Sequence, residues 1–211
     1  MYLKVLGGGL RMLNTQPRHA EDLERLQALV FPTLSREERM QAKHYLNHIR
    51  IYPEGQFVVL DGDKVIGTTS SIQTLYTEAD HTFLQISDNL WFGTHNPLGD
   101  WLYGMDLGIH PDYRGQGLAR LLYRARQELC RSLDLKGQLT VGMLNGYAHY
   151  RHRFSLEDYY QKVINNEIND PTIAMQTKVG FEAIKLVKGY LEDPQCGNAG
   201  VLMALDVKKN V

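Results

Sequence analysis

The residues from 103 to 109 alternate between two kinds of side chain. The apolar positions are Tyr103, Met105, Leu107 and Ile109, and the small or acidic positions are Gly104, Asp106 and Gly108. This period of two predicts a β-strand with one apolar face. After a short turn, apolar residues recur at helical spacing from Leu118 to Leu133, with arginine, glutamine and glutamate on the opposite side. The pattern predicts a strand followed by an amphipathic helix that packs on a sheet.

Similar patterns predict the other elements. The expected strands are 10–13, 57–60, 65 onward, 139–143, 181 toward 190, and 201–205; the expected helices are 20–30, a second one beginning at the Ser35 and Glu38 capping box, and 171–180. The strand at 139–143 should lie parallel to the strand at 103–109, because a helix separates them along the chain. The fold class is therefore α/β (α+β).

Two long segments lie between these elements. Residues 75–100 have mixed polarity and form a connection of the length that is usually functional or mobile. In residues 144–169, Ser155 and Asp158 form a capping box, and apolar residues from Leu156 to Ile164 share one helical face. We expect this second segment to be an ordered helical insertion.

Length and composition limit the class of protein. The chain has 211 residues, a mass of 24.1 kDa and a formal charge of -1, with no linker-like stretch and no long basic run. We therefore expect one domain, 1–211, that binds neither nucleic acid nor membrane. The two cysteines, Cys130 and Cys196, form no disulfide framework, which favours a cytoplasmic location.

The turn between the central strand and helix has the composition of a phosphate-binding loop. Its sequence is Tyr113-Arg114-Gly115-Gln116-Gly117-Leu118-Ala119. Unpaired amides at a helix start attract anions, and glycines allow a polyanion to approach the backbone. The P-loop is excluded because no Gly-Lys-Ser/Thr follows the glycines, and the dinucleotide fingerprint fits poorly because Arg120 occupies the position of its third small residue.

The spacing Arg114-x-x-Gly117-x-Ala119, after an Ile-His-Pro strand end, resembles the acetyl-CoA signature of the GNAT-family N-acetyltransferases. The resemblance implies a mixed central sheet of six to seven strands flanked by helices, with two splayed parallel strands and, here, an extra insertion at 144–169. It also implies that the backbone of Leu107, Gly108 and Ile109 binds pantetheine. The pyrophosphate would lie on the amides of Arg114, Gly115, Gln116, Gly117, Leu118 and Ala119.

One position departs from the family pattern. The family commonly has a tyrosine four residues before a Gly-Phe pair, where its hydroxyl protonates the leaving thiolate. That position is Gln176 here, beside the cofactor, and an amide is no general acid near neutral pH. Tyr147, Tyr159 and Tyr160 of the insertion are alternative donors, with Tyr147 the preferred one; packing is the competing role for each.

Two residues are candidates for the base that accepts the proton of the amine. Asp106 shares the small and polar face of its strand with Gly104 and Gly108, and His95 lies in the long connection, which could overhang the cleft. Histidine has the more suitable ordinary pKa, whereas an aspartate needs desolvation. His149 and His152 have a helical ligand spacing, but no nearby acid or cysteine completes a metal site, so no metal is expected.

These features give two hypotheses. The first is an acetyl-CoA-dependent N-acetyltransferase that acts on a small-molecule or peptide amine, compatible with a homodimer. The second is a non-catalytic acyl-CoA-binding or regulatory module. The insertion, Asn145-Gly146-Tyr147, Gln176 and Tyr190-Leu191 resemble the GNAT subgroup that is fused to carbon-nitrogen hydrolase (nitrilase-like) domains.

Overall fold

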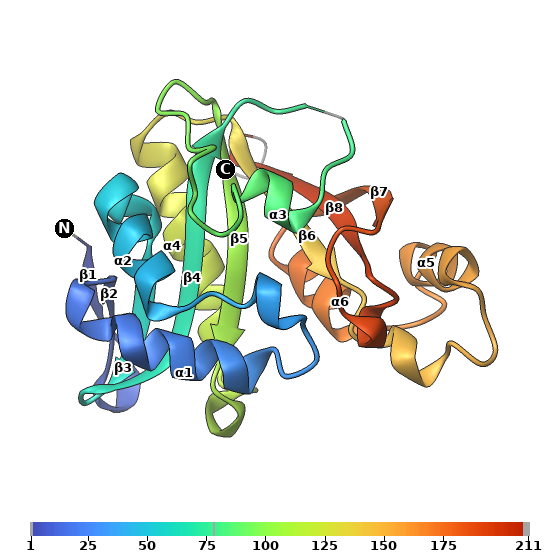
Figure 1. Cartoon of the computed structure of the whole chain (residues 1–211), viewed down its shortest axis with the longest axis horizontal. Helices are drawn as coiled ribbons and strands as arrows, with labels where there is room; N and C mark the ends of the chain where they lie inside the picture. The colour runs from blue at the N-terminus through green and yellow to red at the C-terminus, as the bar shows by residue number, and fades with distance from the viewer. Residues whose placement is uncertain (1, 78, 209–211) are drawn as a thin grey trace.

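A computed structural model describes residues 2–77 and 79–208 (Figure 1). Its eight-stranded sheet has the order β1-β2-β3-β4-β5-β6-β8-β7. The strands are β1 (Leu3–Val5), β2 (Leu10–Asn14), β3 (Phe57–Asp61), β4 (Lys64–Thr74), β5 (Trp101–Ile109), β6 (Gly137–Met143), β7 (Glu182–Lys188) and β8 (Ala199–Asp206). The α-helices are α1 (Ala20–Val30), α2 (Ala42–Ile51), α3 (Phe83–Ile86), α4 (Leu118–Ser132), α5 (Leu156–Ile164) and α6 (Pro171–Lys178).

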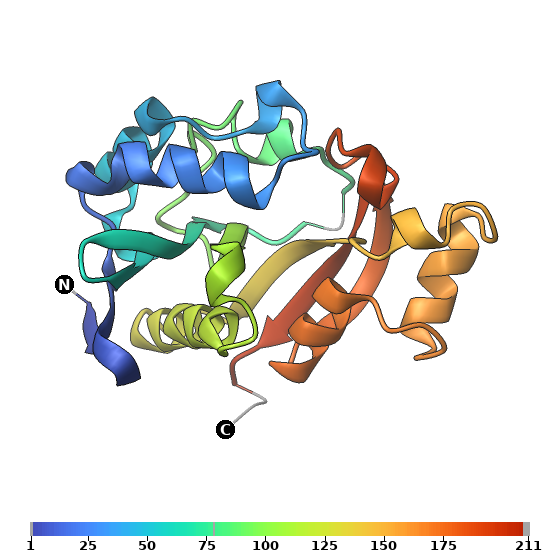
Figure 2. The same ribbon diagram turned by 90° about the horizontal axis from the view of Figure 1, so that it is seen from below.

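The helices cover both faces of the sheet. Figure 2 shows α1 and α2 on one face, with α4 and α6 on the other. The apolar stripe of α4 that the sequence predicts is buried, because Leu118, Leu122 and Ala125 pack with Ile109 of β5 in one cluster of the core. The α/β assignment and the mixed sheet are confirmed, and the short edge strand β1 brings the sheet to eight strands.

The sheet opens between its two parallel strands. Strands β5 and β6 pair in parallel through only four residue pairs, from Trp101 with Gly137 to Gly104 with Thr140. Beyond Gly104, β5 continues to Ile109 along β4, while β6 continues to Met143 along β8. The two strands therefore diverge and leave a wedge-shaped gap on the carboxyl side of the pairing.

A β-bulge interrupts β5 at the point where the wedge begins. Ser70 of β4 pairs with Asp106 and Ser71 pairs with Gly104, so Met105 is an extra residue. As a result, a Cβ added to Gly104 would overlap the Arg126 guanidinium of α4, whereas one added to Gly108 would lie 3.3 Å from Val30 of α1. The prediction that Gly104, Asp106 and Gly108 share one face is wrong for Gly104, because the bulge reverses the alternation.

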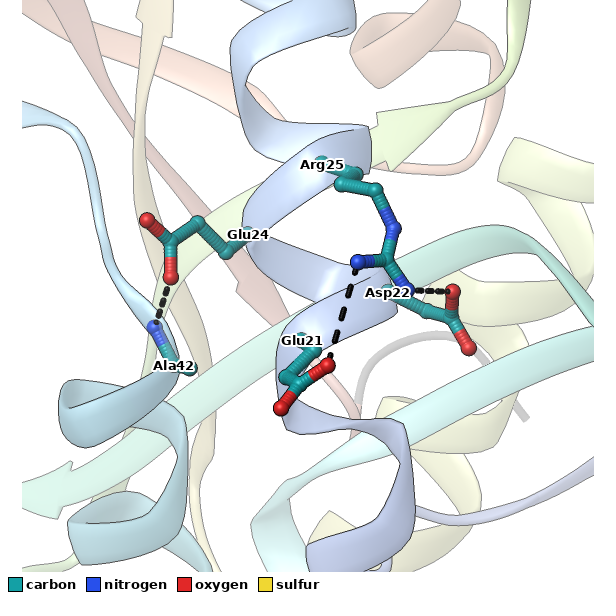
Figure 3. Close-up of polar contacts among 5 residues, drawn as sticks. All are labelled: Glu21, Asp22, Glu24, Arg25 and Ala42. Atoms are coloured by element: carbon teal, nitrogen blue, oxygen red, sulfur yellow. Dashed lines mark hydrogen bonds and ion pairs between the residues drawn. The ribbon is translucent and has the colours of Figure 1, made fainter.

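The second predicted helix begins later than its capping box indicated. Ser35 precedes a short 3-10 helix (Arg36–Glu38), and the carboxylate of Glu38, its last residue, accepts the amide of Glu192 from the loop after β7, at 2.6 Å. Helix α2 begins at Ala42, whose amide donates to the Glu24 carboxylate of α1 at 2.8 Å (Figure 3). The same figure shows Arg25 paired with the carboxylates of its own helix, so Glu24 alone of these acids connects α1 to α2.

The insertion contains the expected helix. Ser155 caps α5 by accepting the amide of Asp158 at 3.1 Å, and α5 lies at the far end of the molecule, beyond α6 (Figure 1). Tyr159 on this helix is buried and donates to the Asp170 carboxylate, which also caps α6. Across the described residues, no helix is both long and apolar enough to span a membrane.

Candidate acyl-coenzyme A site

The predicted phosphate loop forms the wall of a cavity of about 350 Å³ at the start of α4. Gly117 is the N-cap of the helix, with φ of +80°, and Gly115 has φ of +76°. Both values lie in the left-handed region that favours glycine. A Cβ added to either residue would meet nothing within 4 Å, so the space beside these backbones is open.

The charge at this cavity suits an anion. Arg114, Arg120 and Lys178 line it, together with the amino end of α4. The Nε–H of Arg114 donates to the Ile109 carbonyl at 3.3 Å, which fixes the side chain across the end of β5. Gly115, Gly117, Leu118 and Ala119 also line the cavity, whereas Gln116 of the predicted set does not.

A second cavity, of about 160 Å³, occupies the wedge between β5 and β6. Its lining comes from seven parts of the chain: Gln27, Phe31 and Leu34; Phe83; Met105, Asp106 and Leu107; Tyr123; Thr140 to Met143 with Asn145; Thr172, Met175 and Gln176; and Tyr190 and Leu191. Met175 of α6 lines both cavities. The two spaces therefore adjoin at one side chain.

In the described residues, the edge of β5 that faces the wedge has no partner strand beyond Gly104. The His110 amide donates to the Ile66 carbonyl of β4 at 2.8 Å. Because backbone groups alternate sides along a strand, the amides and carbonyls of Leu107 and Ile109 point away from β4, toward the wedge. The predicted pantetheine strand thus offers Leu107 and Ile109 on this edge, while Gly108 points its backbone groups toward β4.

Asp106 lies in the wall of the wedge cavity, directly after the bulge. One carboxylate oxygen accepts the Ser70 amide at 2.6 Å, and the other, Oδ2, has no hydrogen-bond partner in the described part of the chain. Burial raises the pKa of this carboxyl group, although the Ser70 hydrogen bonds, the nearby Arg126 charge and the Tyr45 hydroxyl oppose the shift. A desolvated carboxylate with one unpaired oxygen can accept a proton.

On the α4 side of the sheet, Tyr123 lines the same cavity, and Arg126 of the same helix lies next to the Tyr123 ring. The Gln176 amide nitrogen donates to the Tyr123 hydroxyl at 2.9 Å, and the Arg126 guanidinium lies 5.1 Å from the centre of the Tyr123 ring. Arg126 is only 1% exposed and donates to the Thr69 hydroxyl at 3.2 Å. Burial lowers its pKa, and the nearby Tyr123 and Asp106 oppose that shift. Tyr123 was not among the predicted site residues, because its helical spacing makes it another member of the buried stripe.

A chain of three side chains reaches the cavity from the surface. The Tyr190 hydroxyl lies 3.2 Å from that of Tyr103, which lies 2.8 Å from Nε2 of His81. The other ring nitrogen of His81 is 3.2 Å from the Ala79 carbonyl. A carbonyl can only accept, so Nδ1 of a neutral His81 carries the hydrogen and Nε2 accepts from Tyr103. The hydroxyl hydrogens of both tyrosines then point outward, away from the cavity.

Two predicted catalytic residues lie outside this cavity. Nδ1 of His95 accepts the Gln73 amide at 3.1 Å, its ring stacks on Tyr52 at 4.5 Å, and burial lowers its pKa. Tyr147 packs on Tyr159, with ring centres 5.4 Å apart. The structure therefore does not bring His95 or Tyr147 to Asp106: the long connection folds back on the far end of β4, and the insertion packs beyond α6. Within the described ranges, no group of three or more His, Cys, Asp or Glu residues could hold a metal ion.

Comparison with known proteins supports the family. The model of the acetyltransferase (GNAT) family matches residues 20–155, so the chain belongs to this family. It is 32% identical to an uncharacterized N-acetyltransferase of Bacillus subtilis, YkwB, over 86% of this chain and 83% of that protein. It is 31% identical to the probable hydrolase YhcX of the same organism, over 85% of this chain but only 35% of YhcX, so the chain spans about a third of that relative.

Solved structures agree on the fold. The loading GNATL domain of CurA from Lyngbya majuscula has a TM-score of 0.81 at 21% identity, with 95% of this chain and 98% of that domain covered. The GNAT-like decarboxylase GphF, solved in complex with isobutyryl-CoA, has a TM-score of 0.75 at 20% identity, with 93% and 99% covered.

Proposed function

We propose that the protein is an acetyl-CoA-dependent N-acetyltransferase that acts on an amine of a small molecule or peptide. The observation that carries this proposal is the meeting of two cavities at Met175: one at the amino end of α4, lined by Arg114 and Lys178, and one in the wedge between β5 and β6. A pyrophosphate in the first cavity and an acyl thioester in the second would be connected by a pantetheine arm along the free edge of β5. The isobutyryl-CoA complex of GphF shows that a protein of this fold holds an acyl-CoA.

The size of the wedge cavity favours a short acyl group. A volume of about 160 Å³ is close to that of an engineered cavity of ~150 Å³ that binds benzene. Since the same space must also admit the attacking amine, an acetyl group fits better than a long chain. We assign acetyl-CoA as the donor on this basis.

The wedge supplies two of the groups that acyl transfer needs. The Leu107 amide points toward the gap and belongs to a residue that lines the wedge cavity, so we assign it to the oxyanion, in preference to the Ile109 amide nearer the phosphate loop. Asp106, through its unpaired Oδ2, would accept the proton that the amine loses. His95 and Tyr147 have no place in this scheme.

The wider setting follows from two further observations. Cys130 and Cys196 are free and buried, which suits a reducing cytoplasm, where we place the protein. The similarity to one third of YhcX, which is named a probable hydrolase, supports a relation to acetyltransferase modules joined to hydrolases. The alternative function, a non-catalytic acyl-CoA-binding module, would use the same cavities and would differ only in lacking turnover. A homodimer remains a prediction for either function.

One pair of measurements tests the proposal. Isothermal titration calorimetry should detect acetyl-CoA binding, and a hundredfold excess of ligand over its Kd should stabilise the fold by about 2.7 kcal/mol. Release of CoA thiol with a panel of primary amines and peptide amines should then occur at a rate above hydrolysis. Binding without release would favour the non-catalytic module, and absence of binding to well-folded protein would refute both functions.

A further inference from the structure

The leaving thiolate of CoA needs a proton, and position 176 has no hydroxyl to supply it. The Gln176 side chain instead reaches across from α6 to α4, where its Nε2 donates to the Tyr123 hydroxyl oxygen at 2.9 Å. Its own Oε1 lies over Gly142 of β6, where an added Cβ would overlap it. Both Gln176 and Tyr123 line the wedge cavity, and both are 3% exposed.

The hydrogen bond from Gln176 determines how the Tyr123 hydroxyl is used. A phenol oxygen can accept and donate at the same time. Here the oxygen accepts from the amide, and in the described part of the chain no acceptor is recorded for its hydrogen. The hydrogen is therefore available to a group inside the cavity.

The other hydroxyls of the cavity are less suitable donors. The hydrogen of Tyr190 points outward along the chain to His81, as described above. Thr140 donates to the Gly104 carbonyl at 3.3 Å. Thr172 accepts from Asn145 at 2.6 Å, but an aliphatic alcohol is a far weaker acid than a phenol, whose ordinary pKa of about 10 is close to that of a thiol. Tyr123 is the hydroxyl with both a free hydrogen and suitable acidity.

We propose that Tyr123 is the proton donor to the CoA thiolate and that Gln176 is the residue that positions it; this inference rests on the proposed function. The amine nitrogen bonds to the thioester carbonyl carbon, and the carbon–sulfur bond then breaks with its electron pair on sulfur. The Tyr123 hydroxyl hydrogen passes to the sulfur and gives CoA thiol. The amine loses one proton, which passes to Asp106 and from there to solvent. The Tyr123 phenolate takes up one proton from solvent. In total, one proton leaves nitrogen and one arrives at sulfur.

The surroundings of Tyr123 would stabilise the transient phenolate. The Arg126 guanidinium lies 5.1 Å from the ring centre, and the Gln176 amide hydrogen remains directed at the oxygen. Burial raises the pKa of Tyr123, while Arg126 and Gln176 both act to lower it. The charge that would appear on oxygen is thus met by a buried cation and a hydrogen-bond donor.

Three variants test the assignment. Tyr123→Phe keeps the ring that packs edge-on against Phe181 at 5.3 Å and removes only the hydroxyl. Tyr159→Phe is the matched control, because its hydroxyl donates to Asp170 outside the cavity. The double variant Tyr123→Phe/Gln176→Tyr returns a hydroxyl to α6. Each is assayed for kcat and KM by CoA thiol release and for the Kd of acetyl-CoA by calorimetry.

The expected result is a loss confined to the chemical step. Tyr123→Phe should lower kcat by about 10²- to 10⁴-fold, the usual contribution of a general acid, with the Kd of acetyl-CoA unchanged. Tyr159→Phe should retain the wild-type kcat, and the double variant should recover at least about tenfold over Tyr123→Phe. If Tyr123→Phe retains the wild-type kcat, or loses acetyl-CoA binding in parallel with kcat, the donor assignment is wrong while the proposed function stands.

A structure with CoA bound tests the same point without turnover. The CoA sulfur should lie within 4.0 Å of the Tyr123 hydroxyl oxygen, the limit for a hydrogen bond to sulfur. A sulfur that binds beyond this distance would overturn the inference even if the protein proves active. Failure to bind CoA at all would instead refute the proposed function, and the donor assignment with it.

Discussion

The clearest test of the phosphate loop is a pair of glycine substitutions with the same backbone strain. Gly117→Trp alters the N-cap of α4, where φ is +80° and a Cβ would meet nothing within 4 Å. Gly62→Trp alters the turn between β3 and β4, where φ is +58° and the space is equally open. Of these two glycines, Gly117 lines the proposed pyrophosphate cavity and Gly62 does not.

The magnitude follows from the conformation of the two residues. Placing a residue with a side chain in the left-handed backbone conformation lowers the free energy of unfolding by roughly 1–2 kcal/mol. For a chain of 211 residues, each kcal/mol lowers the Tm by about 2–4 °C, so both variants should melt about 2–8 °C below the wild type. The indole at position 117 would in addition fill space that the phosphates need, and its loss of affinity should therefore exceed about tenfold, or 1.4 kcal/mol.

The assay is thermal denaturation without ligand, followed by calorimetric titration with acetyl-CoA. We expect similar losses of Tm in the two variants and a loss of affinity in Gly117→Trp alone. If Gly117→Trp folds and binds acetyl-CoA with the wild-type Kd, the assignment of this loop is wrong. If Gly62→Trp loses as much affinity, then strain rather than blocked approach explains the result.

Three predictions concern stability. Burial lowers the pKa of His48 from 6.5 to about 3, so the unfolded chain binds the proton first and stability falls as pH falls from about 6.5 toward 3. The free energy of unfolding measured by urea titration should therefore be about 2.7 kcal/mol lower at pH 4.5 than at pH 7 because of this group. If His48→Gln loses the same free energy between these two pH values, His48 is not the cause. Gly104→Ala should lower the free energy of unfolding by about 1–3 kcal/mol, because the added methyl group overlaps the Arg126 guanidinium. The double variant Gly104→Ala/Arg126→Met should recover part of the lost Tm, and no recovery would show that Arg126 is not the source of the strain. Glu24→Ala should lower the free energy of unfolding by about 1 kcal/mol, since it removes the carboxylate that accepts the first amide of α2. The control Glu21→Ala loses only an exposed contact with Arg25 at 3.9 Å and should change the free energy of unfolding little (Figure 3). Equal effects of the two variants would show that the contact between Glu24 and α2 does not stabilise the fold.

The elements with strong local signals were predictable from the sequence. The strand and helix around Gly117, the helix in the insertion and the parallel strand at 139–143 all follow from periodicity and capping, which depend on neighbouring residues. The second helix was misplaced because the Glu38 carboxylate, which looks like part of a local cap, bonds the amide of Glu192, a residue distant in sequence.

The residues around the thioester position were harder to predict, for two physical reasons. First, the bulge at Met105 reverses which residues of β5 share a face, and an alternating sequence gives no sign of it. Second, the Gln176 and Tyr123 contact joins residues 53 positions apart on different helices. His95 was an attractive base by its ordinary pKa, but only the folded chain shows that its ring nitrogen is engaged by the Gln73 amide.

The short parallel pairing of β5 and β6 has a mechanical consequence. In the part of the chain that the structure describes, four residue pairs between β5 and β6 are the only strand pairing that joins β1 to β5 with β6, β8 and β7. A pantetheine arm bonded along the open edge of β5 would act as a partial ninth strand and would brace the two halves against each other. Amide hydrogens of β5 and β6 should then exchange more slowly when the coenzyme is bound, because the bound donor would hold the two halves of the sheet together.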